Sequence, residues 1–247
     1  MSRLFAIVNA TSLILFSSFA LLCSVNAASA ANFDNDEKAA IRQVIKKYIK
    51  DNPEILRDAL LGLAAHEEKA KIKAGIKEAQ LDDGDPIMGN KNGSMVIYEF
   101  TDYNCGYCKR MFAPIQQILA NNDDIQMVIK EFPILSQSSL TAAQAGIAAQ
   151  RQGKFPAFHK EMMTYRGQVS DESIMAAARK SGLNINQLQQ DMDRPTTAAI
   201  IKRTRAGAAA LDLNGTPAFI IGETVIPGAV SIDELQRAID RERAKQN

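Results

Sequence analysis

The sequence predicts an α/β fold that combines one mixed sheet with a large block of helices. Three patterns support this. A strand, helix and strand follow one another over residues 95–132, a nearly continuous helical pattern covers 140–210, and two short strands and a helix begin at 218. The first unit implies a parallel strand pair joined by a right-handed crossover. Its loop and helix start are therefore expected at the carboxyl end of a buried strand.

Composition limits the class of protein. The chain has 247 residues, of which 46% are hydrophobic and 23% charged, and its formal net charge is +1. These values exclude wholesale disorder and a multi-span membrane protein. A balanced charge also gives no general attraction to nucleic acid, which is therefore not expected as a partner. The length predicts one main domain with an appendage.

The first thirty residues predict a secretory signal peptide. Arg3 is the only charge before Asp34, an apolar stretch covers 4–23, and small residues follow at Ala28–Ala31. Cleavage is expected after Ala30, or after Ala27 at an alternative site. An uncleaved anchor helix is the competing interpretation, because about 20 apolar residues can span a bilayer. Removal of residues 1–30 takes Cys23 with it and leaves two cysteines in the exported chain.

Residues 31–85 are predicted to form a helical extension. A cap near Asp34 begins one helix, and Asn52 and Pro53 begin a second. The charged stretch over 67–78 is typical of a helix that crosses solvent, so it predicts a spacer and linker. A turn-rich segment then separates this extension from the main domain, expected over 86–247.

The extension carries an apolar stripe that needs a partner. The stripe consists of Ile41, Val44, Ile45, Tyr48, Ile49, Leu56, Leu60 and Leu63. Burial of each side chain is worth about 1.5–3 kcal/mol, so the stripe is expected to pack either on the main domain or on another copy of the chain. The charged spacer favours the second alternative, a homo-oligomer held together through residues 34–80.

Cys105 and Cys108 form the candidate catalytic pair. They lie where a predicted strand has just ended and a helix begins, and a helix N-terminus favours the Cys105 thiolate. Cys105 is then the attacking sulfur and Cys108 the resolving one. A structural disulfide would close too small a loop to stabilise much. Zinc needs more ligands than His66 and His159 add, and Lys109 stands where haem attachment needs histidine, so no metal site is predicted.

Two other features accompany the dithiol. Thr216–Pro217 precedes the strand at 218, where a cis or an ordinary trans bond is compatible with the spacing. Glu99 interrupts an apolar strand before Cys105. Its side chain points either to solvent or into the protein below the dithiol, where it could accept the proton of Cys108.

Together, Glu99, the Cys105–Gly106–Tyr107–Cys108 motif, the helical block and Thr216–Pro217 resemble the DsbA-like branch of the thioredoxin superfamily, from Met95 to the C-terminus. The resemblance implies a thioredoxin-like fold with a helical subdomain inserted at about 138–195. It also implies a cis Pro217, a substrate-binding lip at Thr216 and Pro217, and a buried acid at Glu99. Residues 102–110 are similar to the suppressor-of-copper-sensitivity C proteins and the Com1-type exported proteins.

The resemblance implies a periplasmic thiol:disulfide interchange enzyme that acts on cysteine-containing exported proteins, with a redox-active Cys105–Cys108 disulfide and no other cofactor. Gly106–Tyr107 lacks the histidine of the DsbA oxidases, and Thr216 replaces their valine. Both differences favour a disulfide isomerase or reductase. The alternatives are a DsbA-type oxidase recycled by a membrane redox partner, and a protein that binds copper(I) through the same thiolates.

Overall fold

The structure is a computed structural model, and it describes residues 33–80 and 82–246. The chain divides into two compact units, residues 1–59 and 60–247, and each is described here by itself. The predicted signal peptide and Cys23 lie outside the described residues. Among the residues that are described, no helix is both long and apolar enough to span a membrane.

The described part of the first unit is helical, as predicted. Helix α1 (Asn35–Asp51) begins with a capping box in which Asp34 accepts a hydrogen bond from the Glu37 N–H and Glu37 accepts one from the Asp34 N–H. Helix α2 (Pro53–Ala79) starts at a proline, whose missing N–H costs nothing at this position, and continues into the second unit. No residue of α1 is buried.

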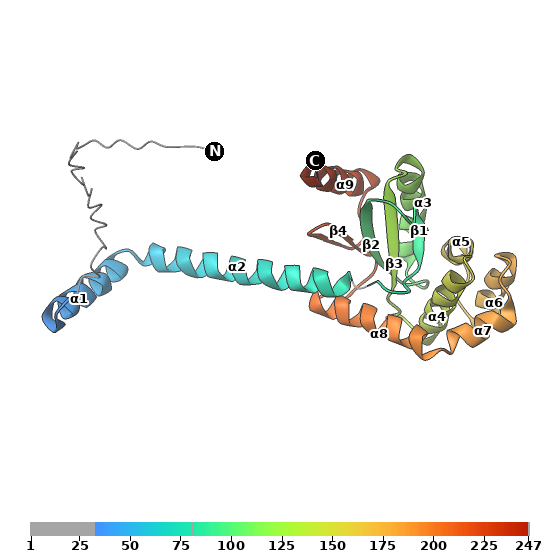
Figure 1. The fold of residues 1–247 in the computed structure, drawn as a ribbon, viewed down its shortest axis with the longest axis horizontal. Helices are drawn as coiled ribbons and strands as arrows, with labels where there is room; N and C mark the ends of the chain where they lie inside the picture. Colours follow the sequence, from blue (N-terminus) through green and yellow to red (C-terminus); the bar gives the residue numbers. More distant parts are fainter. Residues whose placement is uncertain (1–32, 81, 247) are drawn as a thin grey trace, which may run out of the picture. The chain divides into compact units, whose positions relative to one another are not determined.

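The second unit is built on a five-stranded sheet with the order β1-β3-β2-β4-β5 (Figure 1). The strands are β1 (Ile87–Gly89), β2 (Met95–Thr101), β3 (Ile125–Glu131), β4 (Ala218–Ile221) and β5 (Thr224–Pro227). Strands β2 and β3 are parallel, which confirms the predicted crossover, and the other pairs are antiparallel. Strand β1 is not predicted from the sequence, because three residues are too few to show a period.

Alternating residues of the central strands serve two cores. Ile97, Met127 and Ile129 pack with helices α3 (Gly106–Asn121) and α9 (Ile232–Gln246). The intervening residues Tyr98 and Phe100 face the opposite core, which α8 (Pro195–Ala210) and the end of α2 complete. The sheet is thus buried on both faces, as its apolar central strands require. The fold class is the predicted thioredoxin-like α/β fold.

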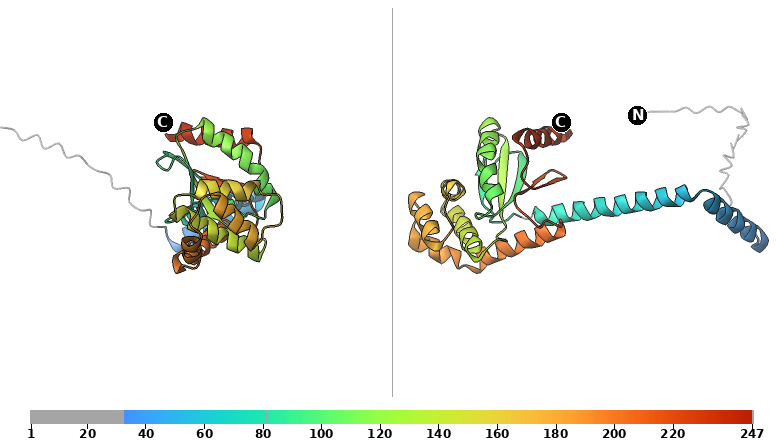
Figure 2. Two further views of the ribbon diagram at one scale, coloured as in Figure 1. Left: turned by 90° about the vertical axis from the view of Figure 1, so that its right-hand side faces the viewer. Right: turned by 180° about the vertical axis from the view of Figure 1, so that it is seen from behind.

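A block of helices follows β3. It consists of α4 (Gln137–Arg151), α5 (Phe155–Thr164), α6 (Asp171–Lys180), α7 (Ile185–Met192) and α8. Helices α4 to α7 lie together as a group, which Figure 2 shows from behind. Their shared interior includes the fully buried Phe155 and Phe158. This is the inserted helical subdomain that the resemblance implies.

The structure differs from the sequence prediction at the end of α2. Ile76 lies in the charged stretch and Ala79 directly follows it, yet they are 5% and 1% exposed and pack against the sheet. Helix α8 runs beside these last turns (Figure 1), and Gly207 permits the approach because a Cβ there would lie 2.7 Å from the Cα of Ala79. A narrow apolar face is therefore sufficient to dock this end of the helix, and only its preceding turns remain exposed.

Candidate active site

The dithiol lies at the end of β2 and the start of α3. Cys105 is the N-cap residue of α3, with extended backbone angles, and its N–H donates to the Asp102 carbonyl at 2.9 Å. The Cys108 N–H points at the Cys105 Sγ, 3.5 Å away. The sulfur thus takes the position that a serine or aspartate oxygen occupies at other helix starts. Both cysteines are free thiols in this structure.

The peptide bond between Thr216 and Pro217 is cis, as the resemblance implies. It lies against the dithiol, because the Cys105 Sγ is 3.1 Å from the Thr216 carbonyl oxygen, to which the thiol donates a hydrogen bond. Residues separated by more than a hundred positions in the chain are therefore brought together at one sulfur atom.

The two thiols have opposite acidities. The pKa of Cys105 is lowered to about 5, first by a hydrogen bond from the Cys108 thiol, which outweighs the opposing effect of burial, and then by hydrogen bonds from the Thr216 side chain and from the backbone N–H groups of Cys108 and Tyr107. The pKa of Cys108 is raised, mainly because this side chain is buried and also because its proton is shared with Cys105. At neutral pH the pair consequently carries one thiolate, on Cys105.

The Glu99 side chain points into the protein and not to solvent, which decides between the two orientations that the sequence leaves open. It is 2% exposed and lies on the sheet face that α3 covers. Burial, and to a lesser extent the charge of the Cys105 thiolate, together raise its pKa to about 8. Glu99 is therefore protonated near neutral pH and within electrostatic reach of both cysteines.

Asp102 holds the active-site loop, although it is not among the site residues that the sequence predicts. Its carboxylate is 1% exposed and accepts hydrogen bonds from the backbone N–H groups of Asn104, Ile134 and Leu135 and from the Ser139 hydroxyl. It thereby joins the residue before Cys105 to the loop between β3 and α4. The only feature of the sequence that could have indicated this role of Asp102 is its position directly after a buried strand.

A second buried polar group lies beneath the same loop. The Tyr103 hydroxyl is 2.8 Å from a Glu131 carboxyl oxygen and 3.0 Å from His159 Nδ1, and all three residues are nearly inaccessible. Burial lowers the pKa of His159 to about 3 and raises that of Glu131 well above its usual range. His159 is thus a neutral, packed histidine. In the sequence, the signal for Glu131 is an acidic residue at the end of the apolar run predicted as a strand over 125–132.

The remaining motif residues are more exposed. Gly106 and Tyr107 begin α3, and the Tyr107 side chain is 59% exposed with its ring centroid 4.1 Å from the Arg110 guanidinium carbon. Within the described part of the chain, no group of three histidine, cysteine, aspartate or glutamate side chains is placed to hold a metal ion.

The fold and this site agree with a known family. A family model described as thioredoxin matches residues 81–241. The chain belongs to the thioredoxin family. Solved structures of this fold include a thioredoxin-like oxidoreductase from Silicibacter pomeroyi DSS-3, which is 39% identical, with a TM-score of 0.64 over 66% of this chain and 94% of that chain.

Two further thioredoxin-fold structures bear on the DsbA-like resemblance. The thiol-disulfide exchange protein alpha-DsbA2 from Wolbachia pipientis is 28% identical, with a TM-score of 0.66 over 71% of this chain and 96% of that one. ScsC from Proteus mirabilis, in a transitional conformation, is 26% identical, with a TM-score of 0.63 over 88% of this chain and 100% of that one. The DsbA-like and suppressor-of-copper-sensitivity resemblance is therefore confirmed.

Curated relatives of this thioredoxin-family chain include an Na(+)/H(+) antiporter NhaA 1 from Mycobacterium sp. strain KMS. It is 29% identical over 165 residues, which are 64% of this chain. The chain spans only 27% of the length of that relative.

Proposed function

We propose that this protein catalyses thiol:disulfide interchange on cysteine-containing exported proteins through Cys105 and Cys108. The observation that carries the proposal is the asymmetry of the pair: Cys105 has a pKa of about 5, whereas burial keeps Cys108 protonated. A thiolate is the attacking species in disulfide exchange, so Cys105 is reactive at neutral pH without a separate base.

The geometry supports a two-step reaction. The Cys105 thiolate attacks a substrate disulfide, so that one substrate sulfur joins Cys105 and the other leaves as a thiolate. Cys108 then loses its proton and displaces the bound substrate sulfur, which forms the Cys105–Cys108 disulfide and transfers two electrons to the substrate. Glu99, when ionised, is the buried base that can accept this proton. Thr216 and Pro217 lie beside Cys105 and would hold the substrate backbone.

Within this chemistry we assign isomerase or reductase activity rather than oxidase activity. Burial is the main cause of the raised pKa of Cys108. We expect this burial to persist when Cys105 is in a mixed disulfide. Slow ionisation of Cys108 lengthens the life of that mixed disulfide, which gives a second substrate thiol time to attack. Gly106–Tyr107 and Thr216 support the same assignment through the family resemblance.

The extension supports self-association. Ile45, Tyr48 and Leu60 are 52%, 57% and 57% exposed in the single chain, and they belong to a longer apolar stripe. Exposed stripes of this size mark interaction surfaces. A homo-oligomer with several dithiols would raise the effective concentration of active sites around one misfolded substrate. Substitution of Ile45 and Leu60 by glutamate should yield monomers in sedimentation equilibrium, and an unchanged oligomeric mass would contradict this assignment.

The proposed compartment is the periplasm, reached through the signal peptide predicted at 1–30. The solved structures support it, because one of similar fold is described as a periplasmic thioredoxin-like protein from Salmonella enterica serovar Typhimurium. A membrane redox partner would return the dithiol to its working state. The compartment can be tested by fractionating cells that express the full chain, since a cytoplasmic pool of uncleaved protein would contradict the proposal.

The decisive experiment is recovery of activity from a scrambled-disulfide substrate in buffer with a trace of reducing thiol. Isomerase activity predicts recovery with the wild-type protein and none with Cys105→Ser. Rapid oxidation of a reduced substrate without recovery would instead identify a DsbA-type oxidase. Absence of both reactions, together with no reduction of a substrate disulfide by the reduced protein, would refute thiol:disulfide interchange altogether.

Copper(I) binding is the second candidate function. The two thiol side chains are joined by a hydrogen bond, and thiolates are the ligands that copper(I) prefers. Tight copper(I) binding that disappears in Cys105→Ser, without turnover of disulfide substrates, would support it. No binding by the reduced wild-type protein would exclude it.

A further inference from the structure

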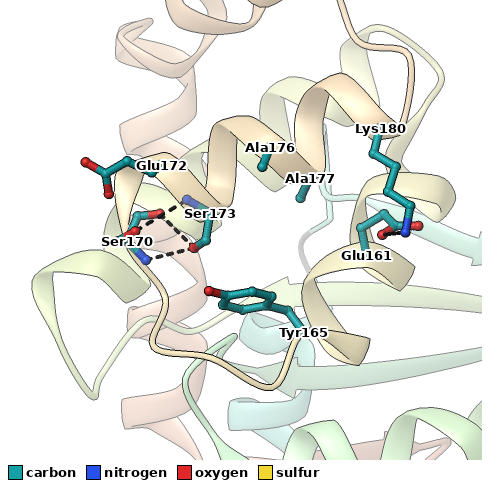
Figure 3. A pocket seen from close by; sticks show the side chains of 8 residues that line it. All are labelled: Glu161, Tyr165, Ser170, Glu172, Ser173, Ala176, Ala177 and Lys180. Atoms are coloured by element: carbon teal, nitrogen blue, oxygen red, sulfur yellow. Dashed lines mark hydrogen bonds and ion pairs between the residues drawn. The ribbon is translucent and has the colours of Figure 1, made fainter.

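A cavity opens between the end of α5 and helix α6. Its volume is about 480 Å³, and its walls include the Tyr165 ring and the small side chains Ala176 and Ala177 (Figure 3). Tyr165 ends α5 as its C-cap residue, and its ring lies across from α6 in Figure 3. The volume is ample for one large side chain and too small for a folded domain.

The aromatic wall is held in place from two sides. Lys109, the residue after Cys108, donates from Nζ to the Tyr165 carbonyl at 2.9 Å, and its ammonium lies 5.7 Å from the ring centroid. Gly167 leaves room for the Tyr165 hydroxyl, because a Cβ at this position would overlap it. Tyr165 nevertheless remains 39% exposed. A partly exposed ring that is fixed in orientation is typical of a binding wall.

Four polar side chains of the cavity wall are paired with one another, and Glu172, which also lines the cavity, is exposed in the first turn of α6. Ser170 and Ser173 bond to each other in the capping box that begins α6. Lys180 pairs with Glu161 at 2.7 Å and neutralises it. Because these groups bond to one another, the surface left for a ligand is mainly the tyrosine ring and the alanine side chains. The cavity is therefore suited to an apolar group rather than an ion.

Lys109 connects a residue of the cavity wall to the helix turn that carries the dithiol. The Lys109 N–H donates to the Cys105 carbonyl at 3.1 Å, in the first turn of α3, while its side chain reaches the cavity wall. One lysine side chain thus spans the separation between that turn and the wall. An extended polypeptide advances about 3.3 Å per residue, so a substrate joined to Cys105 can present a nearby side chain to the cavity.

We propose that the cavity between α5 and α6 binds an aliphatic or aromatic side chain of the polypeptide joined to Cys105. The inference rests on the proposed function, because the polypeptide is the thiol:disulfide substrate. Misfolded exported proteins expose such side chains, whereas folded proteins bury them. The cavity would then give preference to non-native substrates, in which an apolar residue lies a few positions from an accessible cysteine.

The test uses the full chain and synthetic peptides. Each peptide has one cysteine as a mixed disulfide with glutathione in a Ser/Gly sequence, and a single Phe is moved one position at a time along both sides. Attack by the Cys105 thiolate forms the Cys105–peptide disulfide and releases glutathione thiolate, whose rate of appearance is measured. The wild-type protein should favour Phe at one position by about tenfold over the peptide without Phe.

Two variants test the cavity, and one is a control. Ala176→Leu fills it from an exposed helical position, and Gly167→Ala displaces the Tyr165 ring, so each should reduce the preference to about one. Ala209→Leu adds the same group at an exposed position of α8 that does not line the cavity, and should keep the tenfold preference. Thermal unfolding confirms that all three variants fold.

The outcomes separate the two proposals. Equal rates for all peptides with the wild-type protein, or a preference that survives Ala176→Leu, would overturn the side-chain cavity and leave the enzyme assignment intact. Absence of glutathione release from every peptide would refute the proposed function itself.

Discussion

The acidity of Cys105 depends mainly on Cys108, and this dependence can be tested by one substitution. The leading cause of the lowered pKa of Cys105 is the hydrogen bond that its thiolate receives from the Cys108 thiol. Cys108→Ala removes that donor, whereas Cys108→Ser keeps a hydroxyl donor of similar size at the same place. Both variants leave Cys105 as the single cysteine of the described chain, so it titrates without a second thiol.

The magnitude follows from the contact that is lost. A hydrogen bond to a charged group contributes about 1.5–3 kcal/mol, and about 1.4 kcal/mol corresponds to one pKa unit. The pKa of Cys105 should therefore rise from about 5 to about 6–7 in Cys108→Ala. It does not reach the value of a free thiol, because the Cys108 N–H and the start of α3 remain. In Cys108→Ser the pKa should stay closer to about 5.

The assay is the rate of alkylation of Cys105 by iodoacetamide as a function of pH, since only the thiolate reacts. At pH 6, a shift from about 5 to about 6.5 reduces the thiolate fraction from about nine-tenths to about a quarter. The ultraviolet absorbance of the thiolate gives an independent measurement of the pKa of Cys105. Identical midpoints in Cys108→Ala and Cys108→Ser would refute the assignment of the acidity to this hydrogen bond.

Three further predictions concern stability. Glu99 keeps its proton in the native state up to about pH 8, whereas its ordinary pKa is 4.5, so native stability should fall with rising pH across this window. The free energy of unfolding should fall by up to about 1.4 kcal/mol per pH unit in the wild-type protein, and Glu99→Gln should remove this fall. Urea denaturation at several pH values measures it, and the same pH dependence in both proteins would show that the Glu99 carboxyl is ionised in the native state. Ile129→Ala leaves a cavity under the sheet and should cost about 2–5 kcal/mol, and a loss below about 1 kcal/mol in the same assay would contradict the packing. Asp85→Ala removes the carboxylate that lies 2.6 Å from the buried Lys130 ammonium and 2.9 Å from Arg203. The variant should lose about 3–5 kcal/mol of the free energy of unfolding, and an unchanged urea midpoint would show that these ion pairs contribute little.

Local patterns predict most of the helices and strands in both units. The apolar runs at β2 and β3, the proline that starts α2 and the serine that begins α9 each determine their element within a few residues, because capping and periodicity are local properties. Strand β1 and the docked end of α2 are different. Ile76 and Ala79 are buried only because α8 and the sheet come close to them, and the charged residues around them conceal that contact.

Some features of the candidate site are also predicted from the sequence, whereas others depend on the tertiary structure. The spacing of Cys105 and Cys108 at a helix start indicates a reactive pair from the sequence alone, and the structure places both residues where that pattern predicts. Burial of Glu99 and the contact between Thr216 and Cys105 could not be derived from spacing. Both depend on strands β2 and β4, which are far apart in the chain and neighbours in the sheet.

The sequence by itself determined the order of the elements, the position of the dithiol and the presence of an apolar helical extension. Each of these follows from residues that are close together in the chain. Only the tertiary structure decided which acids are buried, how far the pKa values of the two thiols differ and where a cavity opens between α5 and α6. A pKa shift arises from desolvation and from contacts across the fold, and a cavity arises from the way helices pack, so neither is encoded in a local pattern.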